Sequence, residues 1–98
     1  MSAGAGSDRS RETVLVRYWA GARAAAGTAE DTFDVDGDLS LSALVTRVLE
    51  RHPDERMART VAVCSVLVGD RPVRSQDPDA VVITPGTVVE LLPPFAGG

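Results

Sequence analysis

Hydrophobic and polar positions alternate in three stretches of the chain, 13–19, 28–35 and 87–92. A period of two is typical of a strand with one buried face. One side of these stretches is apolar, and we expect it to face the core: Val14, Val16, Tyr18, Phe33, Val35, Val89 and Leu91. The other side of the first and last stretches includes charged residues, and we expect it to face solvent: Leu15, Arg17, Trp19, Val88, Glu90 and Leu92. The pattern therefore predicts a sheet with one covered face and one open face.

A helical period occurs in one stretch, where apolar residues recur at intervals of three and four positions. These residues are Leu41, Leu44, Val45, Val48 and Leu49. Ser40 precedes them and is a favourable N-cap, because its hydroxyl can accept a free backbone N–H of the first turn. Pro53 predicts the end of the helix after His52, and we interpret His52 as a helix C-terminal residue without a catalytic role. We expect Leu44 and Val48 to be buried against the sheet.

Other segments predict the connections and a further strand. The alanine-rich segment 20–27 could form a helical turn that Gly27 ends. The segment 55–59 is polar and poorly patterned, while 60–68 (TVAVCSVLV) predicts a buried strand, alone or with a preceding turn. Pro85–Gly86 is typical of a type II turn. The order strand, strand, helix, strand, strand predicts the α+β class, with one helix across a small sheet.

Composition narrows the class of protein. The chain has 98 residues, enough for one small domain, and carries 14 acidic against 10 basic residues, for a net charge of −4. All the basic residues are arginine. This balance argues against nucleic acid or an anionic membrane surface as the main partner, because either requires clustered positive charge. No apolar stretch is long enough to span a membrane, and the first residues lack the apolar core of a secretory signal, so we expect a cytoplasmic protein.

The side chains offer little for catalysis. His52 is the single histidine, lysine is absent, and no Ser/His/Asp or Cys/His spacing is present. Cys64 is the single cysteine, which excludes an internal disulfide and an iron–sulfur ferredoxin, since the latter needs about four cysteine ligands. Its apolar neighbours favour a buried thiol. We expect no metal site, no bound cofactor and no catalytic site of the chain's own.

The carboxyl end has a distinct composition. Pro93 and Pro94 cannot donate ladder hydrogen bonds, so we expect the sheet to stop at Leu92 and the tail to project in an extended conformation. Gly97 and Gly98 lack a Cβ atom, so they could pass through a narrow channel and leave the terminal carboxylate unhindered. The predicted organisation is a disordered segment at 1–12, a folded domain at 13–92 and a flexible, reactive tail at 93–98.

This tail, Leu91-Leu92-Pro93-Pro94-Phe95-Ala96-Gly97-Gly98, resembles that of the MoaD/ThiS sulfur carriers. The resemblance extends from Val14 to Gly98 and is specific at the tail, whereas elsewhere it is one of pattern. The segments that share the pattern are 16–20, 23–27, 44–53 and 85–86. The spacing Pro-Pro-x-x-Gly-Gly favours the molybdopterin branch over the thiamine branch.

The resemblance implies a ubiquitin-like β-grasp fold, in which one main helix packs across a mixed sheet of four to five strands. It also implies that Gly98 is the reactive residue, with Gly97 providing steric clearance. A ubiquitin-activating-type enzyme would adenylate the Gly98 carboxylate with ATP and Mg²⁺, and a sulfur donor protein would convert it to a thiocarboxylate. The large subunit of molybdopterin synthase would then use this sulfur to build the dithiolene of molybdopterin. The chain itself would be a carrier subunit.

In a β-grasp sheet the first and last strands are neighbours, which implies a docking face beside the tail. Trp19 would be its anchor, since tryptophan is enriched among binding hot spots, and Arg17 and Glu90 could pair across the two strands. The residues expected to contact partners are Leu15, Arg17, Trp19, Leu92, Pro93, Pro94, Phe95 and Ala96.

Two alternatives remain open. The chain could carry sulfur for another pathway, such as one leading to thiamine, cysteine or a thiolated metabolite. It could instead be a ubiquitin-like tagging or interaction module without sulfur chemistry. In that case it could not build lysine-linked chains on itself, because it contains no lysine.

Overall fold

The computed structural model describes residues 12–94. The strands are β1 (Glu12–Tyr18), β2 (Glu30–Val35), β3 (Leu39–Ser40), β4 (Ser65–Val68), β5 (Arg71–Pro72), β6 (Val82–Ile83) and β7 (Val88–Leu92). The helices in this part of the chain are α2 (Ala20–Ala26), α3 (Leu41–Arg51) and α4 (Glu55–Ala62). The predicted α+β class is confirmed.

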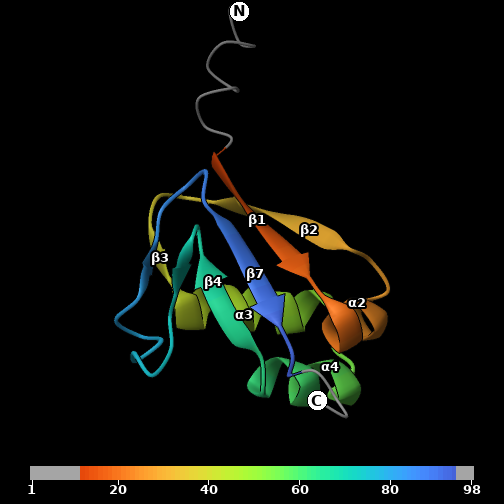
Figure 1. The fold of residues 1–98 in the computed structure, drawn as a ribbon. Coiled ribbons are helices and arrows are strands. Elements are labelled where there is room, and N and C mark those ends of the chain that lie inside the picture. Colours follow the sequence, from red (N-terminus) through yellow and green to blue (C-terminus); the bar gives the residue numbers. More distant parts are fainter. Residues whose placement is uncertain (1–11, 95–98) are drawn as a thin grey trace, which may run out of the picture.

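Five strands form one mixed sheet in the order β2-β1-β7-β4-β5 (Figure 1). β1 and β7 are parallel neighbours at its centre, and every other pair in this sheet is antiparallel. The two-residue strands β3 and β6 lie outside this sheet and pair with each other. The expectation that the first and last strands lie side by side is therefore confirmed.

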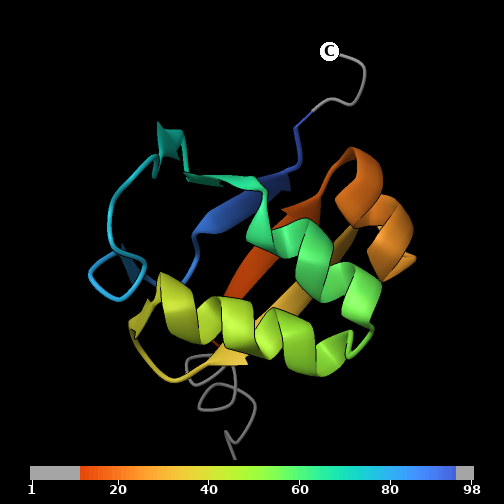
Figure 2. The ribbon, with the colours of Figure 1, turned by 90° about the horizontal axis from the view of Figure 1, so that it is seen from below.

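The helices cover one face of the sheet and leave the other face open (Figures 1 and 2). The core between the layers contains the inward residues expected from the alternation, all of them buried: Val14, Val16, Tyr18, Phe33, Val35, Val89 and Leu91. From α3, Leu44 and Val48 are each only 1% exposed. The hydroxyl of Ser40 accepts the N–H of Ala43 at 3.0 Å, as expected for the N-cap.

Two predicted turns depend on glycine in the left-handed region. Gly27 ends α2 with φ of 76°, and its N–H donates to the carbonyl of Arg23. Gly86 has φ of 89°, and the turn it belongs to closes with a 3.2 Å hydrogen bond from the N–H of Thr87 to the carbonyl of Thr84. A side chain with a Cβ is disfavoured at both positions, so glycine here sets the entry into β2 and into β7.

The prediction of a strand over 60–68 is wrong in its first half. Residues 55–62 form α4, and the strand begins only at Ser65. The carboxylate of Asp54 accepts the N–H of Arg56 at 2.9 Å and caps this helix, while Met57 and Val61, one turn apart, are buried. The β-branched run after residue 60 suggested a strand. Burial of one face of a short amphipathic helix outweighs that weak local preference.

Candidate functional site: the open sheet face and the end of β7

The end of β7 lies at the centre of the sheet. The N–H of Trp19 donates to the carbonyl of Leu91 at 3.1 Å, which continues the β1–β7 ladder to the penultimate residue of β7. Pro93 is buried and Pro94 is exposed. We expected the projecting tail to begin at Pro93, but this residue is buried, because the inward side of β7 extends through it. The other predicted tail residues, Phe95, Ala96, Gly97 and Gly98, lie outside the described residues.

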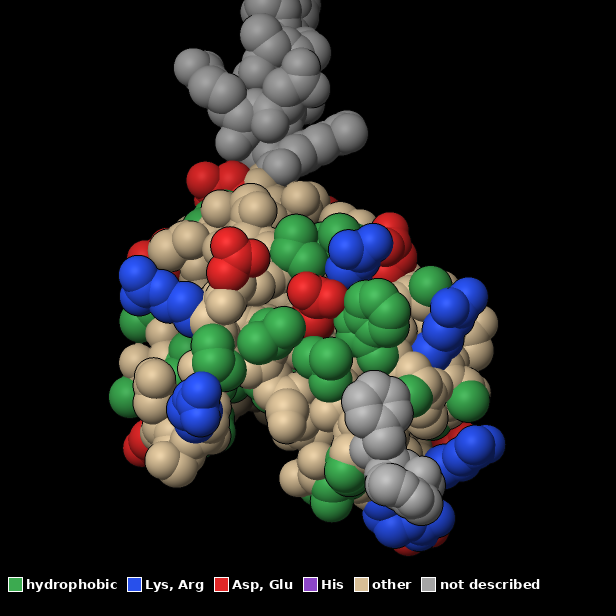
Figure 3. Space-filling model, in the orientation of Figure 1, with side chains coloured by type: hydrophobic (Ala, Val, Ile, Leu, Met, Phe, Trp, Pro, Cys, Tyr) green, Lys and Arg blue, Asp and Glu red, His purple; other side chains and the backbone are tan. Residues whose placement is uncertain are grey.

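Apolar side chains gather on the open face over β1, β7 and β4 (Figure 3). This apolar patch consists of Leu15, Trp19, Leu67, Val88 and Leu92, all at least partly exposed. Trp19 is 46% exposed, which makes it one of the most exposed large apolar side chains described. The register places Leu15 beside Val88, and both lie on the face that the alternation predicted for them.

Leu67 belongs to the patch although the alternation did not predict it. It pairs with Glu90 across β4 and β7, so both residues point to the open face. The segment Val66-Leu67-Val68 is apolar at every position, and a continuous apolar run does not reveal which residue points outward. The strand pairing decides it.

The two charged residues of the open face do not pair with each other. Arg17 and Glu90 are in register on β1 and β7, but Arg17 Nε lies 3.6 Å from Glu30 Oε1 on the neighbouring strand β2. Glu90 Oε1 instead accepts a hydrogen bond of 2.8 Å from Trp19 Nε1. The expected Arg17–Glu90 pair is thus replaced by two contacts, because each charged group finds a partner elsewhere on the same face.

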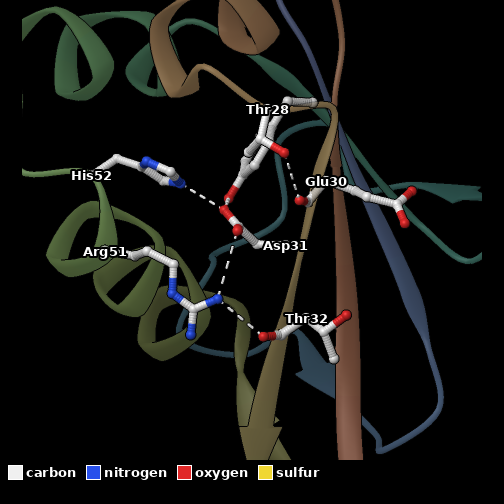
Figure 4. A network of polar contacts seen from close by, with 7 residues as sticks. Thr28, Glu30, Asp31, Thr32, Arg51 and His52 are labelled. Carbon is white, nitrogen blue, oxygen red and sulfur yellow. Dashed lines mark hydrogen bonds and ion pairs between the residues drawn. The ribbon is translucent and has the colours of Figure 1, made fainter.

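A second polar cluster lies on the opposite face, where the end of α3 meets β1 and β2 (Figure 4). Asp31 is its centre. Asp31 Oδ2 accepts a hydrogen bond from the Tyr18 hydroxyl at 2.8 Å and lies 2.5 Å from His52 Nε2. Arg51 Nη1 lies 3.6 Å from Asp31 Oδ1 and donates to the carbonyl of Thr32 at 3.0 Å. These contacts join an edge strand to the C-terminus of the main helix.

The electrostatics of this cluster favour an ionised Asp31. Burial by itself raises the pKa of the Asp31 carboxyl, but hydrogen bonds from His52 and Tyr18 and the charges of His52 and Arg51 outweigh burial and hold this pKa below its ordinary value. Burial and the Asp31 hydrogen bond raise the pKa of the Tyr18 phenol, so Tyr18 is a neutral donor. All of these groups are engaged with one another, which fits a structural clamp.

Cys64 is half-buried and its thiol donates to the carbonyl of Thr60 at 3.3 Å. Burial raises the pKa of this thiol to about 11. At neutral pH the group is therefore a thiol, and the thiolate is the form that acts as a nucleophile. Between residues 12 and 94, no group of three or more histidine, cysteine, aspartate or glutamate side chains is arranged to hold a metal ion.

Comparison with known proteins identifies several relatives. The ThiS family model matches residues 16–98. The molybdopterin synthase sulfur carrier subunit of Chlamydomonas reinhardtii is 28% identical over 85 residues, which cover 87% of this chain and 98% of that protein.

Solved structures share the fold. The small archaeal modifier protein 1 of Haloferax volcanii is 18% identical, with a TM-score of 0.69 over 86% of this chain and 99% of that one. The complex of subunits 1 and 2 of the molybdopterin-converting factor of Helicobacter pylori contains a chain that is 22% identical, with a TM-score of 0.62 over 88% of this chain and 99% of that one. The fold is the ubiquitin-like β-grasp, as the tail resemblance implied. None of the helices between residues 12 and 94 has the length and apolar character needed to cross a lipid bilayer.

Proposed function

The chain belongs to the ThiS family, and we propose that it is a cytoplasmic sulfur carrier whose reactive group is the carboxylate of Gly98. One observation carries this proposal. The family match runs through Gly98, and the strand that leads to this residue ends at the centre of the sheet, beside an exposed apolar patch. A partner that docks on the patch is therefore adjacent to the point from which the tail leaves the domain.

The proposed chemistry takes place on the carboxylate. A free carboxylate resists nucleophilic attack, so a ubiquitin-activating-type enzyme first joins Gly98 to AMP with release of pyrophosphate from MgATP. Sulfide-level sulfur supplied by a donor protein then attacks the carbonyl carbon of this acyl-adenylate; the bond to AMP breaks, AMP leaves, and sulfur takes the place of one carboxylate oxygen. ATP and Mg²⁺ are substrates of the activating enzyme, and the carrier needs no cofactor of its own. Gly97 leaves steric clearance around the reacting carbon.

In this proposal the sulfur is used to build the dithiolene of molybdopterin, on the large subunit of molybdopterin synthase. The Chlamydomonas relative and the two-subunit complex from Helicobacter pylori support this choice. We assign docking to Leu15, Arg17, Trp19 and Leu92, with Pro94, Phe95 and Ala96 leading into the partner's channel. Pro93 is buried in the isolated domain, so it supports the start of the tail from within the core.

The carrier has no catalytic site of its own in this proposal. Two features of the described side chains support that view: the Cys64 thiol is neutral at pH 7, and His52 is engaged with Asp31. Catalysis then resides in the activating enzyme and in the large subunit.

A ubiquitin-like modifier is the second candidate, favoured by the fold shared with the small archaeal modifier protein. In that case Gly98 would form an amide with a target protein. A carrier for thiamine or another thiolated metabolite would share the thiocarboxylate and differ in its recipient.

Intact-mass spectrometry separates these functions. The full chain is incubated with its adenylating enzyme, MgATP and a sulfur source, and we expect the mass to rise by the difference between sulfur and oxygen. The loaded protein should then form molybdopterin with the large subunit. If an active enzyme set gives no mass change, sulfur carriage is wrong; if amide conjugates accumulate instead, the modifier function is correct.

A further inference from the structure

The apolar patch has an acidic group among its hydrophobic side chains (Figure 3). Glu90 is the residue responsible. It lies on β7 between Val88 and Leu92, in register with Leu67 on β4. Its carboxylate accepts a hydrogen bond from the indole N–H of Trp19. A charge in the middle of an apolar docking face restricts what can cover that face.

In the free domain, protein groups fill only part of the hydrogen-bonding capacity of this carboxylate. It has two oxygens with about four acceptor sites, and Trp19 Nε1 is its single side-chain hydrogen-bond donor among residues 12–94. Glu90 is half-buried, so water can reach the remaining sites. When a partner covers the patch that water is excluded, and an uncompensated buried carboxylate is strongly unfavourable.

Arg17 is the cation that the β1–β7 register places beside Glu90, within the part of the chain that the structure describes. Its guanidinium is directed to Glu30, at 3.6 Å, on the far side of β1 from Glu90. The short contact from Trp19 also places the indole of the anchor residue against Glu90. The chain therefore leaves a carboxylate with open acceptor sites toward the incoming partner.

We propose that Glu90 restricts binding to partners with a complementary positive charge: the surface that docks on the patch is apolar and carries one arginine or lysine opposite Glu90. The inference rests on the docking face of the proposed function and adds the chemical character of the partner. An otherwise similar apolar surface without that cation would be rejected by the desolvation of Glu90.

The test measures association and dissociation rates of the full chain with the purified large subunit of molybdopterin synthase. Glu90→Gln keeps an oxygen for the indole N–H but removes the charge, so the partner's cation is left unpaired. We expect the dissociation rate to rise about thirtyfold or more while the association rate changes little, as for a buried charge pair. Glu50→Gln, the same change on the exposed side of α3, is the matched control and should leave both rates unchanged.

Two comparisons make the outcome decisive. If Arg17 turns to Glu90 on binding, the effect of Glu90→Gln disappears in an Arg17→Gln background, and this coupling would overturn the proposal; additive effects support it. If Trp19→Ala weakens binding while Glu90→Gln does not, the patch is the docking face but the proposal that the partner carries a cation opposite Glu90 is wrong. If neither change weakens binding, the docking face is wrong as well, whereas the mass measurement tests sulfur loading separately. Unchanged thermal unfolding and an unchanged far-ultraviolet circular dichroism spectrum show that Glu90→Gln folds normally.

Discussion

Replacing Asp31 with alanine tests whether the cluster at the end of α3 holds the sheet to the main helix. The change removes the acceptor of the Tyr18 hydroxyl and the carboxylate beside His52 and Arg51. Tyr18 is 2% exposed, and a buried hydroxyl left without a partner costs about 1–3 kcal/mol.

The hydrogen bond to His52 is worth about 1.5–3 kcal/mol if the imidazole is charged. The contact with Arg51 adds little, because the Arg51 side chain is 42% exposed. Allowing for relaxation and residual water, we expect Asp31→Ala to lower the free energy of unfolding by about 2–4 kcal/mol. That is a large share of the stability of a small domain.

Chemical denaturation at pH 7 measures this loss, with Asp34→Ala as the control. Asp34 lies on the same strand and is exposed, so its replacement should change the free energy of unfolding by less than about 0.5 kcal/mol. An equally small loss for Asp31→Ala would refute the clamp.

The pH dependence of the same variant has a defined sign. The pKa of Asp31 is lowered in the folded state, so its ionised form stabilises the fold above the unfolded pKa of about 3.9, and this stability is lost as pH falls through the folded value. The difference in unfolding free energy between wild type and Asp31→Ala should therefore shrink as the pH falls below about 4. A difference that does not change in acid would show that the charge of Asp31 contributes nothing.

Three further changes test the core, the docking face and the tail. Leu44→Ala should cost about 2–5 kcal/mol of unfolding free energy in chemical denaturation, because Leu44 is 1% exposed; a loss under about 1 kcal/mol would place α3 outside the core. Trp19→Ala should weaken binding to the large subunit by about 2 kcal/mol or more in calorimetry with the thermal midpoint retained, and equal affinity would exclude the patch as the docking site. Deleting Gly97 and Gly98 should abolish sulfur loading in the intact-mass assay and leave the unfolding curve unchanged. If the shortened chain is still loaded, the reactive group is not the Gly98 carboxylate.

Much of the architecture could be predicted from local patterns. The alternation around Val14 and Val89 identified the inward face of both central strands, because side chains of a strand point alternately to its two sides. The interval of three and four residues around Leu44 identified the main helix, and Ser40 and Pro53 marked its ends. The tail from Pro93 onward is a local signal as well, and its order of residues is enough to indicate the family.

Other features depend on which distant segments become neighbours. The register of β1 against β7 places Glu90 within hydrogen-bond distance of the Trp19 indole. The register of β1 against β2 places Arg17 beside Glu30, with which it forms an ion pair. Asp31 and His52 meet only because α3 ends over the edge strand β2. Each of these contacts joins residues on different elements. Local periodicity shows which way a side chain points within its own element, but it does not show which residue of another element will lie opposite.

The inward and outward faces of the central strands, the position of the main helix and the family resemblance of the tail all follow from the periodicity and chemistry of neighbouring residues. Long-range packing is what makes 55–62 a helix, adds Leu67 to the apolar patch and buries Pro93. In each of those cases the local preference is weak or ambiguous, and the outcome depends on which apolar surfaces find a matching surface to cover them.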